Sequence, residues 1–474
     1  MINSFQKQPT RMDLLRVPLL GRFLTWKHTR TLFQILLFAL AAVMLVDGFI
    51  GSQLAPKNVA TVAAWVHYRG LVVLALLLAG NLFCAACPFI LPRKFAKWLG
   101  RPTRRWPKAL RNKWLALASL VGIIYAYELF DLWSSPWLTA WVTVAYFVTA
   151  FVLEAFFTRN SFCMYVCPLG TFNFLYSTVS PLQISSRNLQ TCRDCQGHEC
   201  INGSPTQQGC QLELFVPTIK SNMDCTFCLD CVKACPYDNV ALAVRPPGDE
   251  LFRQTWPRRL DLALIAILAS FMALTNAFAM TPPVYSLEAF LATWLRTSSA
   301  ALVLGIIFLV QAILGPIILV YLAAWLSKLF TAGKSSLNRL VIRYAYSFVP
   351  LGFAIWFAHY LFHFLTGALT IFPAFQTFFA QTLNWPVLGE PNWDLARRFV
   401  PTVDTLQLLQ SGLVYAGLLT ALALAFNAAR KMQKSRLHIF FEALPWLVLL
   451  FGVALASGAT FLLPMEMRGS ALGG

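Results

Sequence analysis

Residues 114–157 read WLALASLVGIIYAYELFDLWSSPWLTAWVTVAYFVTAFVLEAFF, a stretch without a single lysine or arginine. It holds two apolar runs, 114–133 and 138–157, and only the four residues SSPW separate them. An α-helix rises about 1.5 Å per residue, so about 20 apolar residues cross the roughly 30 Å hydrocarbon core of a bilayer. The stretch therefore predicts two antiparallel membrane-spanning helices joined by a tight turn.

The whole chain of 474 residues shares this apolar character. Hydrophobic residues make up 58% of it and charged residues 12%, and the mean hydropathy is +0.61. A soluble domain carries about 25% charged residues and a disordered chain is poor in apolar residues, so the composition excludes both classes. Apolar runs predict an all-α integral membrane bundle of nine spans, at residues 32–50, 63–83, 114–133, 138–157, 262–280, 301–326, 344–372, 406–426 and 439–463.

The positions of the basic residues predict the orientation of these spans. Lysine and arginine number 38 against 20 acidic residues, which gives a net charge of +18. Of the 38, 32 fall on one side of the predicted spans, in segments 1–31, 84–113, 158–261, 327–343 and 427–438. The other side and its flanks hold Lys57, Arg69, Arg296, Arg397, Arg398 and Arg468.

Lysine and arginine are retained on the cytoplasmic side of membrane proteins. We therefore expect a multi-pass protein of a bacterial-type cytoplasmic membrane, with the N-terminus inside and the C-terminus outside. The basic excess follows from this topology, and we expect no nucleic-acid partner. No cleavable signal peptide is expected, because about 30 mostly polar residues precede the first span.

All twelve cysteines lie on the predicted cytoplasmic side or at inner ends of spans, where thiols stay reduced and metal or redox use is favoured over disulfides. The clearest pattern is Cys225-x2-Cys228-x2-Cys231-x3-Cys235, followed by proline. This spacing is typical of bacterial ferredoxins. Three thiolates on one loop bind one [4Fe–4S] cluster, and the fourth binds the neighbouring cluster. A zinc site would need only two C-x2-C pairs, so zinc is the weaker interpretation.

A looser set of cysteines upstream supplies the ligands of a second cluster. Its spacing is Cys192-x2-Cys195-x4-Cys200-x9-Cys210. In two-cluster ferredoxins, the fourth cysteine of each motif binds the cluster of the other motif. We therefore predict that Cys210 binds the cluster of the downstream run and that Cys235 binds the cluster of the upstream set. The predicted metal ligands are Cys210, Cys225, Cys228 and Cys231 for the first cluster, and Cys192, Cys195, Cys200 and Cys235 for the second.

Two further pairs of cysteines, Cys84/Cys87 and Cys163/Cys167, lie at the inner ends of the second and fourth predicted spans. Each pair ends in Cys-Pro. Together the four thiols could bind a third [4Fe–4S] cluster, form a dithiol–disulfide relay or bind a soft metal such as Cu(I). The remaining interpretation is helix-end packing, which explains two matched pairs poorly.

This layout resembles the membrane polyferredoxins of the NapH, NosR and CcoG type. The resemblance covers roughly residues 30–245 and rests on the motifs at 84–88, 163–168 and 225–236. It implies electron transfer between cytoplasmic donors, the quinone pool and periplasmic or metal acceptors. The chain departs from that type in its first motif, where x2 replaces the usual x3, and in its added C-terminal spans.

The motifs and spans together predict five parts. The inserted cytoplasmic part is expected to be an α+β domain like a bacterial ferredoxin with two [4Fe–4S] clusters. The parts are a basic N-terminal arm (1–31), a four-helix membrane module (32–157), the cytoplasmic ferredoxin-like domain (158–261), a five-helix membrane module (262–463) and an outer tail (464–474).

Three histidines in the predicted spans are candidate cofactor ligands. His359 and His363 lie one helical turn apart on the seventh span, and His67 lies near the outer end of the second. Interhelical hydrogen bonding, a quinone pocket and ligation of haem b are the three interpretations. Such a site could receive protons through acidic residues in the spans, namely Asp47 in the first span and Glu128 and Asp131 in the third.

The sequence therefore predicts a membrane-bound iron–sulfur electron-transfer protein. We expect it to link a cytoplasmic donor, ferredoxin-like or of another kind, to quinone or a partner redox subunit, as a subunit of an oxidoreductase. One alternative is an assembly or metal-reducing factor whose Cys84/Cys87 and Cys163/Cys167 pairs handle copper. Another is a membrane redox sensor whose clusters report rather than conduct.

Overall fold

The structure, a computed structural model, describes residues 12–331, 335–433 and 435–466. The beginning of the predicted N-terminal arm and most of the predicted outer tail, including Arg468, lie outside these residues. Within them the chain is mostly helical, and eight helical segments are long and apolar enough to cross a membrane. These segments are Thr29–Ile50, Val59–Leu78, Pro136–Phe156, Leu260–Phe278, Ala300–Thr331, Leu337–Thr382, Val403–Arg430 and Arg436–Leu462.

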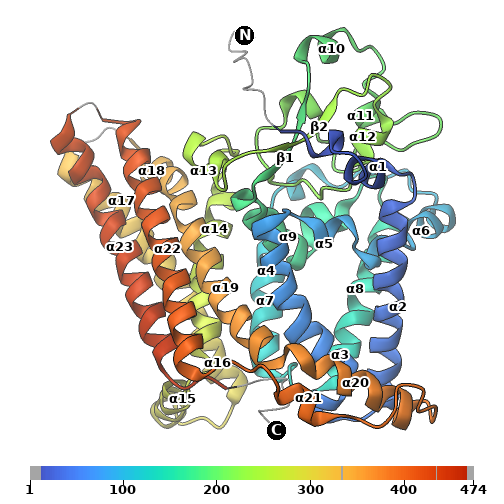
Figure 1. Cartoon of the computed structure of the whole chain (residues 1–474). Helices are drawn as coiled ribbons and strands as arrows, with labels where there is room; N and C mark the ends of the chain where they lie inside the picture. Colours follow the sequence, from blue (N-terminus) through green and yellow to red (C-terminus); the bar gives the residue numbers. More distant parts are fainter. Residues whose placement is uncertain (1–11, 332–334, 434, 467–474) are drawn as a thin grey trace.

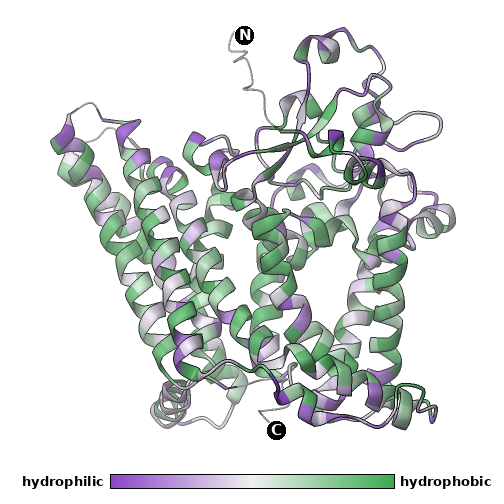
Figure 2. Ribbon diagram, in the orientation of Figure 1, coloured by the Kyte–Doolittle hydropathy of each residue, from purple (hydrophilic) through white to green (hydrophobic). Residues whose placement is uncertain are grey.

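The long helices stand side by side (Figure 1). Figure 2 shows that hydrophobic residues dominate the middle of the helices, while hydrophilic residues gather at their ends and in the segment above them. Large apolar side chains on the outer faces, such as Leu36, Leu419 and Val448, are more than half exposed. In a membrane these faces contact lipid, so this exposure fits a multi-pass membrane protein.

The N-terminal group of helices matches the first four predicted spans in order. The second of these segments contains a π-helical stretch, η3. The members are α2 (Thr29–Ile50), α3 (Val59–Thr61) continuing through η3 (Val62–Tyr68) into α4 (Arg69–Leu78), α7 (Trp114–Leu129) and α8 (Pro136–Phe156).

Helix α7 is shorter than the sequence predicts. It has 16 residues, or about 24 Å of rise, and is therefore not among the eight candidate spans of the described residues. The helix ends because Asp131 takes a left-handed backbone conformation with φ of 45°, which an α-helix cannot continue through. Where nine spans are predicted, the described residues hold eight and one shorter apolar helix.

The C-terminal group begins with α14, which is almost entirely buried among the other helices. Three short helices that the sequence analysis did not predict lie at the end opposite the cysteine-rich segment (Figure 1), namely α15 (Pro282–Leu295), α20 (Ile371–Thr377) and α21 (Trp393–Arg397). The other helices are α14 (Leu260–Phe278), α16 (Ala300–Phe308) continuing through η9 (Leu309–Leu314) into α17 (Gly315–Thr331), α18 (Leu337–Tyr344), α19 (Phe348–Gly367), α22 (Val403–Arg430) and α23 (Arg436–Leu462).

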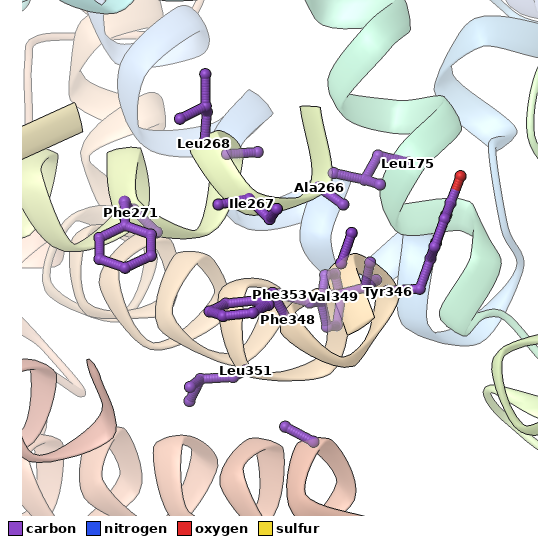
Figure 3. Packing of buried hydrophobic residues seen from close by; sticks show 14 of the residues in the cluster. Leu175, Ala266, Ile267, Leu268, Phe271, Tyr346, Phe348, Val349, Leu351 and Phe353 are labelled. Carbon is purple, nitrogen blue, oxygen red and sulfur yellow. The ribbon is translucent and has the colours of Figure 1, made fainter. Parts of the chain in front are cut away.

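Helix α19 forms the centre of the packing between the two groups. Its apolar residues pack against α14, and Figure 3 shows Phe348 and Phe353 of α19 beside Phe271 of α14. The two helices approach closely because residue 352 is glycine. A Cβ atom there would collide with the side chain of Ser270. Small residues at helix crossings let backbones approach in membranes, where packing replaces the hydrophobic effect as the driving force.

Residues 158–261, which we call the cysteine-rich segment, lie at one end of the bundle. The segment contains one sheet of two antiparallel strands, with Leu182 paired to Val244 and Ser186 to Val240. The described part of the N-terminal arm packs on this sheet, since the backbone N–H of Val244 donates to the carbonyl of Met12 (2.8 Å). The strands and helices of the cysteine-rich segment include β1 (Leu182–Ser186), α10 (Leu189–Asp194), α11 (Glu199–Asn202), α12 (Asp230–Ala234), β2 (Val240–Val244) and α13 (Asp249–Arg253).

A buried ion pair fixes the loop that precedes the main cysteine run. Arg245 Nη2 lies 2.6 Å from Glu250 Oε2, and both side chains are 1% exposed. Glu250 also accepts hydrogen bonds from the Ser221 hydroxyl (2.6 Å) and the Asn222 backbone N–H (2.9 Å). Because the pair carries these further hydrogen bonds, its buried charges are well compensated.

Replacing Glu250 by Ala leaves the Arg245 guanidinium buried without its partner. We expect the free energy of unfolding to fall by about 3–5 kcal/mol, measured by thermal unfolding in detergent. The matched control is Arg253→Ala, which removes an ion pair with Asp249 (2.7 Å) whose arginine is half exposed, and should cost less than about 1 kcal/mol. Equal losses in the two variants would contradict the role of the buried pair.

Candidate functional site

Four cysteines of the cysteine-rich segment surround one cavity, which we call the first cavity. Three of them come from the regular run, and Cys210 comes from the loop before it. The run can wind around the cavity because Phe227 and Leu229 adopt left-handed backbone conformations, with φ of 53° and 59°. The cavity is lined by Cys210, Cys225, Cys228 and Cys231 together with apolar residues, among them Ile184, Leu212 and Ile219.

The other four cysteines of the segment surround a second cavity. Cys235 ends the regular run, yet it lines this cavity and not the first. Asn239 donates from its side chain to Cys192 Sγ (3.1 Å) and from its backbone N–H to Cys235 Sγ (3.5 Å). The second cavity is lined by Cys192, Cys195, Cys200 and Cys235, and also by His198, Glu199 and Phe215.

The structure therefore brings the eight thiols together as two sets of four, the same sets that the spacing predicts. Among the described residues, no group of three or more His, Cys, Asp or Glu side chains is gathered tightly enough to hold a single metal ion. Four thiols match the ligand number of a [4Fe–4S] cluster and also that of a tetrahedral zinc ion.

The remaining four cysteines, which we call the membrane-edge cysteines, come from two helix ends. Cys84 and Cys87 lie in and after α5 (Leu82–Ala85), and Cys163 and Cys167 lie in and after η6 (Phe162–Val166). Cys167 interacts electrostatically with the other three, so all four lie in one neighbourhood.

Two hydrogen bonds reach the sulfur atoms of the membrane-edge cysteines. Cys167 precedes α9 (Pro168–Tyr176), and its Sγ accepts a hydrogen bond from the Gly170 backbone N–H at 3.2 Å. Asn173, also on α9, donates to Cys84 Sγ at 3.4 Å. The N-terminus of a helix favours a negative charge, so this arrangement suits thiolates that bind a metal.

Burial raises the thiol pKa values both around the first cavity and among the membrane-edge cysteines. It raises the pKa of Cys84 to about 11 and that of Cys228 to about 11. The pKa of Cys163 rises to about 12, through burial first and then the nearby charge of Cys84. In the absence of a cation these thiols are protonated at neutral pH. A metal that binds the thiolates would displace those protons and supply the compensating charge.

Arg30 lies between the first cavity and the membrane-edge cysteines. Its guanidinium forms an ion pair with Asp230 in the cysteine run (2.6 Å) and donates to the carbonyl of Ala85 between Cys84 and Cys87 (3.1 Å). It also interacts electrostatically with Cys228 on one side and with Cys87 and Cys163 on the other. One cation is thus shared by two groups of thiols.

Two further residues, Asn81 and Lys113, hold the first cavity against the membrane-edge cysteines. Asn81 donates to the carbonyl of Cys225 at 3.1 Å. Lys113 forms an ion pair with Asp224 and donates to the carbonyl of Met164 at 2.6 Å. Since Cys231 of the first cavity interacts with Cys200 of the second, the three sites form a series with the first cavity in the middle.

The three candidate histidines have different hydrogen-bond partners. His363 Nε2 lies 3.3 Å from Met280 Sδ, and its ring centroid lies 5.1 Å from that of His359. The Nδ1 of His67 lies 3.1 Å from the Val62 carbonyl oxygen, and its Nε2 lies 2.8 Å from the Ala368 carbonyl oxygen. The His67 ring centroid also lies 5.8 Å from that of Phe364, the residue that follows His363. This geometry favours interhelical hydrogen bonding for His67.

The acidic residues proposed as proton carriers have structural partners. Asp47 accepts hydrogen bonds from the Val59 backbone N–H (2.6 Å) and the Thr382 hydroxyl (3.0 Å), and so caps the start of α3. Glu128 accepts a hydrogen bond from Asn276 of α14 at 2.7 Å. Asp131 lies exposed in the turn that follows α7.

The distribution of charges uses Arg69 only to orient the spans. In the structure its side chain lies inside the bundle and is 7% exposed. Its Cζ atom lies 4.1 Å from the ring centroid of Tyr127, 4.8 Å from Trp65 and 5.1 Å from Tyr360. The signal was available, because Arg69 falls inside the predicted span 63–83 and charges within spans are rarely incidental.

Comparisons with known proteins give two partial similarities, while no protein-family model and no solved structure matches. The protein YccM of Escherichia coli (strain K12), whose name refers to electron transport, is 33% identical over 89 residues, which are 19% of this chain and 23% of YccM. The methylamine utilization ferredoxin-type protein MauN of Paracoccus denitrificans (strain Pd 1222) is 27% identical over 159 residues, which are 31% of this chain and 53% of MauN.

The chain thus spans about a quarter of YccM and about half of MauN. Together with the apolar helices, these similarities support a protein of the ferredoxin-like electron-transfer class that lies in a membrane. They do not distinguish among the NapH, NosR and CcoG types, and that finer resemblance belongs to the proposal below.

The raised pKa of Cys84 predicts how the metal-free protein responds to alkaline pH. A thiol with a native pKa of about 11, above the usual 9.0, stabilises the fold fully below pH 9, and this contribution is lost as pH rises through 11. We expect the stability advantage of the wild type over Cys84→Ala to shrink by about 2 kcal/mol between pH 8 and pH 11. Thermal unfolding of both metal-free proteins measures this, and a constant difference would contradict it.

Proposed function

We propose that the protein is a membrane-bound iron–sulfur electron-transfer protein of the NapH, NosR and CcoG type. The observation that carries the proposal is the division of eight cysteines into two sets of four around separate cavities, with Cys210 and Cys235 exchanged between them. This exchange is characteristic of two-cluster ferredoxins, so each cavity would hold one [4Fe–4S] cluster. The similarities to YccM and MauN support the same class of function.

The membrane-edge cysteines would hold a third [4Fe–4S] cluster. Four thiols gathered from two helix ends match the ligand number of a cluster. They also adjoin the first cavity through Arg30. A mere packing role explains neither the grouping of all four thiols nor the shared cation.

The order of the sites suggests the order of electron flow. The second cavity is lined in part by α10, which lies at the end of the cysteine-rich segment away from the helical bundle (Figure 1), so a soluble donor from the cytoplasm could approach this side. The first cavity and the membrane-edge cysteines follow in series, and a quinone or a partner redox subunit would accept the electrons near the latter. The clusters supply one-electron chemistry when bound, while the protein sets their potentials through burial, hydrogen bonds and charge.

Iron and acid-labile sulfide content tests the proposal directly. Anaerobically purified wild-type protein should contain about twelve irons per chain. Because four ligands are needed for each cluster, Cys225→Ser and Cys163→Ser should each lower the iron content by about four. Zinc without sulfide would overturn the proposal, and unchanged iron in both Cys84→Ser and Cys163→Ser would eliminate the third cluster alone.

Arg30→Gln tests the series of sites. Loss of the shared cation destabilises the reduced, more negative clusters nearby, so the midpoint potentials of the first-cavity and membrane-edge clusters should fall by tens of millivolts. The second-cavity cluster should keep its potential. Potentiometric titration followed by electron paramagnetic resonance measures this, with Arg30→Lys as the control that retains the charge. Equal shifts in all three clusters would contradict the proposed order.

A further inference from the structure

A hollow lined by three arginines lies where the chain leaves the cysteine-rich segment and meets α18. We call it the cationic hollow, and its volume is about 320 Å³. Its lining comes from the chain just after α13 and from α18 with the residues before it, and both helices lie toward the same end of the bundle as the cysteine-rich segment (Figure 1). Its lining consists of Arg258, Arg339 and Arg343 with Gln254, Trp256, Ser336, Asn338 and Ile342.

The positive charge of this hollow is not balanced by its own lining, since none of the described residues that line it carries a carboxylate. Other cations at this end of the bundle have acidic partners, such as Arg93 with Glu154 (2.7 Å) and Arg187 with Asp13 (2.8 Å). Glu442 interacts electrostatically with Arg343, but its oxygens already accept hydrogen bonds from Tyr344 and Gln433.

A fourth cation adds to the charge around the cationic hollow. Lys431 lies close enough to Arg258 and Arg343 that, after burial, their charges lower its pKa. Its Nζ donates to the carbonyl of Phe252 at 3.1 Å. The orientation rule for membrane proteins requires basic residues on one side, but it does not require them to converge on one hollow.

The walls of the cationic hollow are held in place by packing. Helix α18 is amphipathic, with Leu340 and Tyr344 buried while Arg339 is exposed. Trp256 stacks on Tyr346 with ring centroids 4.1 Å apart, and the Tyr346 hydroxyl donates to the carbonyl of Pro257 at 3.1 Å. The arginines are therefore displayed from a fixed base.

We propose that the cationic hollow binds the phosphate of an anionic phospholipid headgroup. Basic pockets at the ends of membrane helices have the chemistry for such headgroups, and guanidinium groups bind phosphate in a bidentate manner. The cationic hollow adjoins helix α17, because Asn338 of the lining accepts a hydrogen bond from Tyr321 of that helix (2.7 Å). One helical turn either side of Tyr321, Ile318 is 63% exposed and Trp325 is 50% exposed, so acyl chains can lie along this face.

Lipid binding by delipidated protein in detergent tests the proposal. We expect phosphatidylglycerol to bind in preference to phosphatidylcholine, as counted by native mass spectrometry. Each basic residue near a headgroup contributes roughly a fivefold change in affinity, so Arg339→Gln combined with Arg343→Gln should weaken phosphatidylglycerol binding about thirtyfold. Arg258→Gln alone, in the loop before α14, should weaken it about fivefold.

The matched control is Arg105→Gln combined with Lys108→Gln, which removes two exposed charges from another part of the chain. This control should bind phosphatidylglycerol as the wild type does. Equal weakening in both double variants, or equal binding of the two lipids, would overturn the proposal. Full displacement of the lipid by millimolar inorganic phosphate would assign the hollow to free phosphate instead. Unchanged helicity by circular dichroism shows that each variant is folded.

Discussion

Two ion pairs hold the cysteine-rich segment against the end of the helical bundle, and the arrangement of the three thiol groups depends on them. Arg30 at the beginning of α2 pairs with Asp230, and Lys113 before α7 pairs with Asp224. Both acidic residues belong to the stretch that carries the main cysteine run, so the pairs act on the cavity itself. Their side chains are largely buried, where an unpaired charge would be costly, and this cost favours one docked position.

Docking in this way places buried thiols at the edge of a low-dielectric region. Thiols in such surroundings resist ionisation, as the raised pKa values of Cys84 and Cys163 show. A metal cluster would reverse that balance by supplying positive charge, and Arg30 contributes one further cation between the two groups. Metal binding and the docking of the cysteine-rich segment are therefore expected to stabilise each other.

The helices behind this site serve mainly to hold it rigidly. Helix α14 follows the cysteine-rich segment directly and is buried on nearly all sides, and α19 crosses it closely at Gly352. Helix α19 also contacts α4, where a Cβ at Gly70 would collide with Phe364. Close packing thus connects Cys84 and Cys87, the two membrane-edge cysteines that follow α4, to the C-terminal helices. The buried Arg69 lies at the same junction, with its charge facing three aromatic rings.

The sequence by itself determined the membrane class, the order of the helices and the cysteine motifs, because hydrophobic length and ligand spacing are local properties of the chain. It also predicted the two sets of four cysteines that line the cavities. Tertiary structure alone decided the hydrogen bond of His67 to the Ala368 carbonyl, the place of Arg69 among three aromatic rings, and the position of Arg30 between two thiol groups. These features depend on contacts between residues far apart in the chain, which no local pattern of apolar or charged residues records.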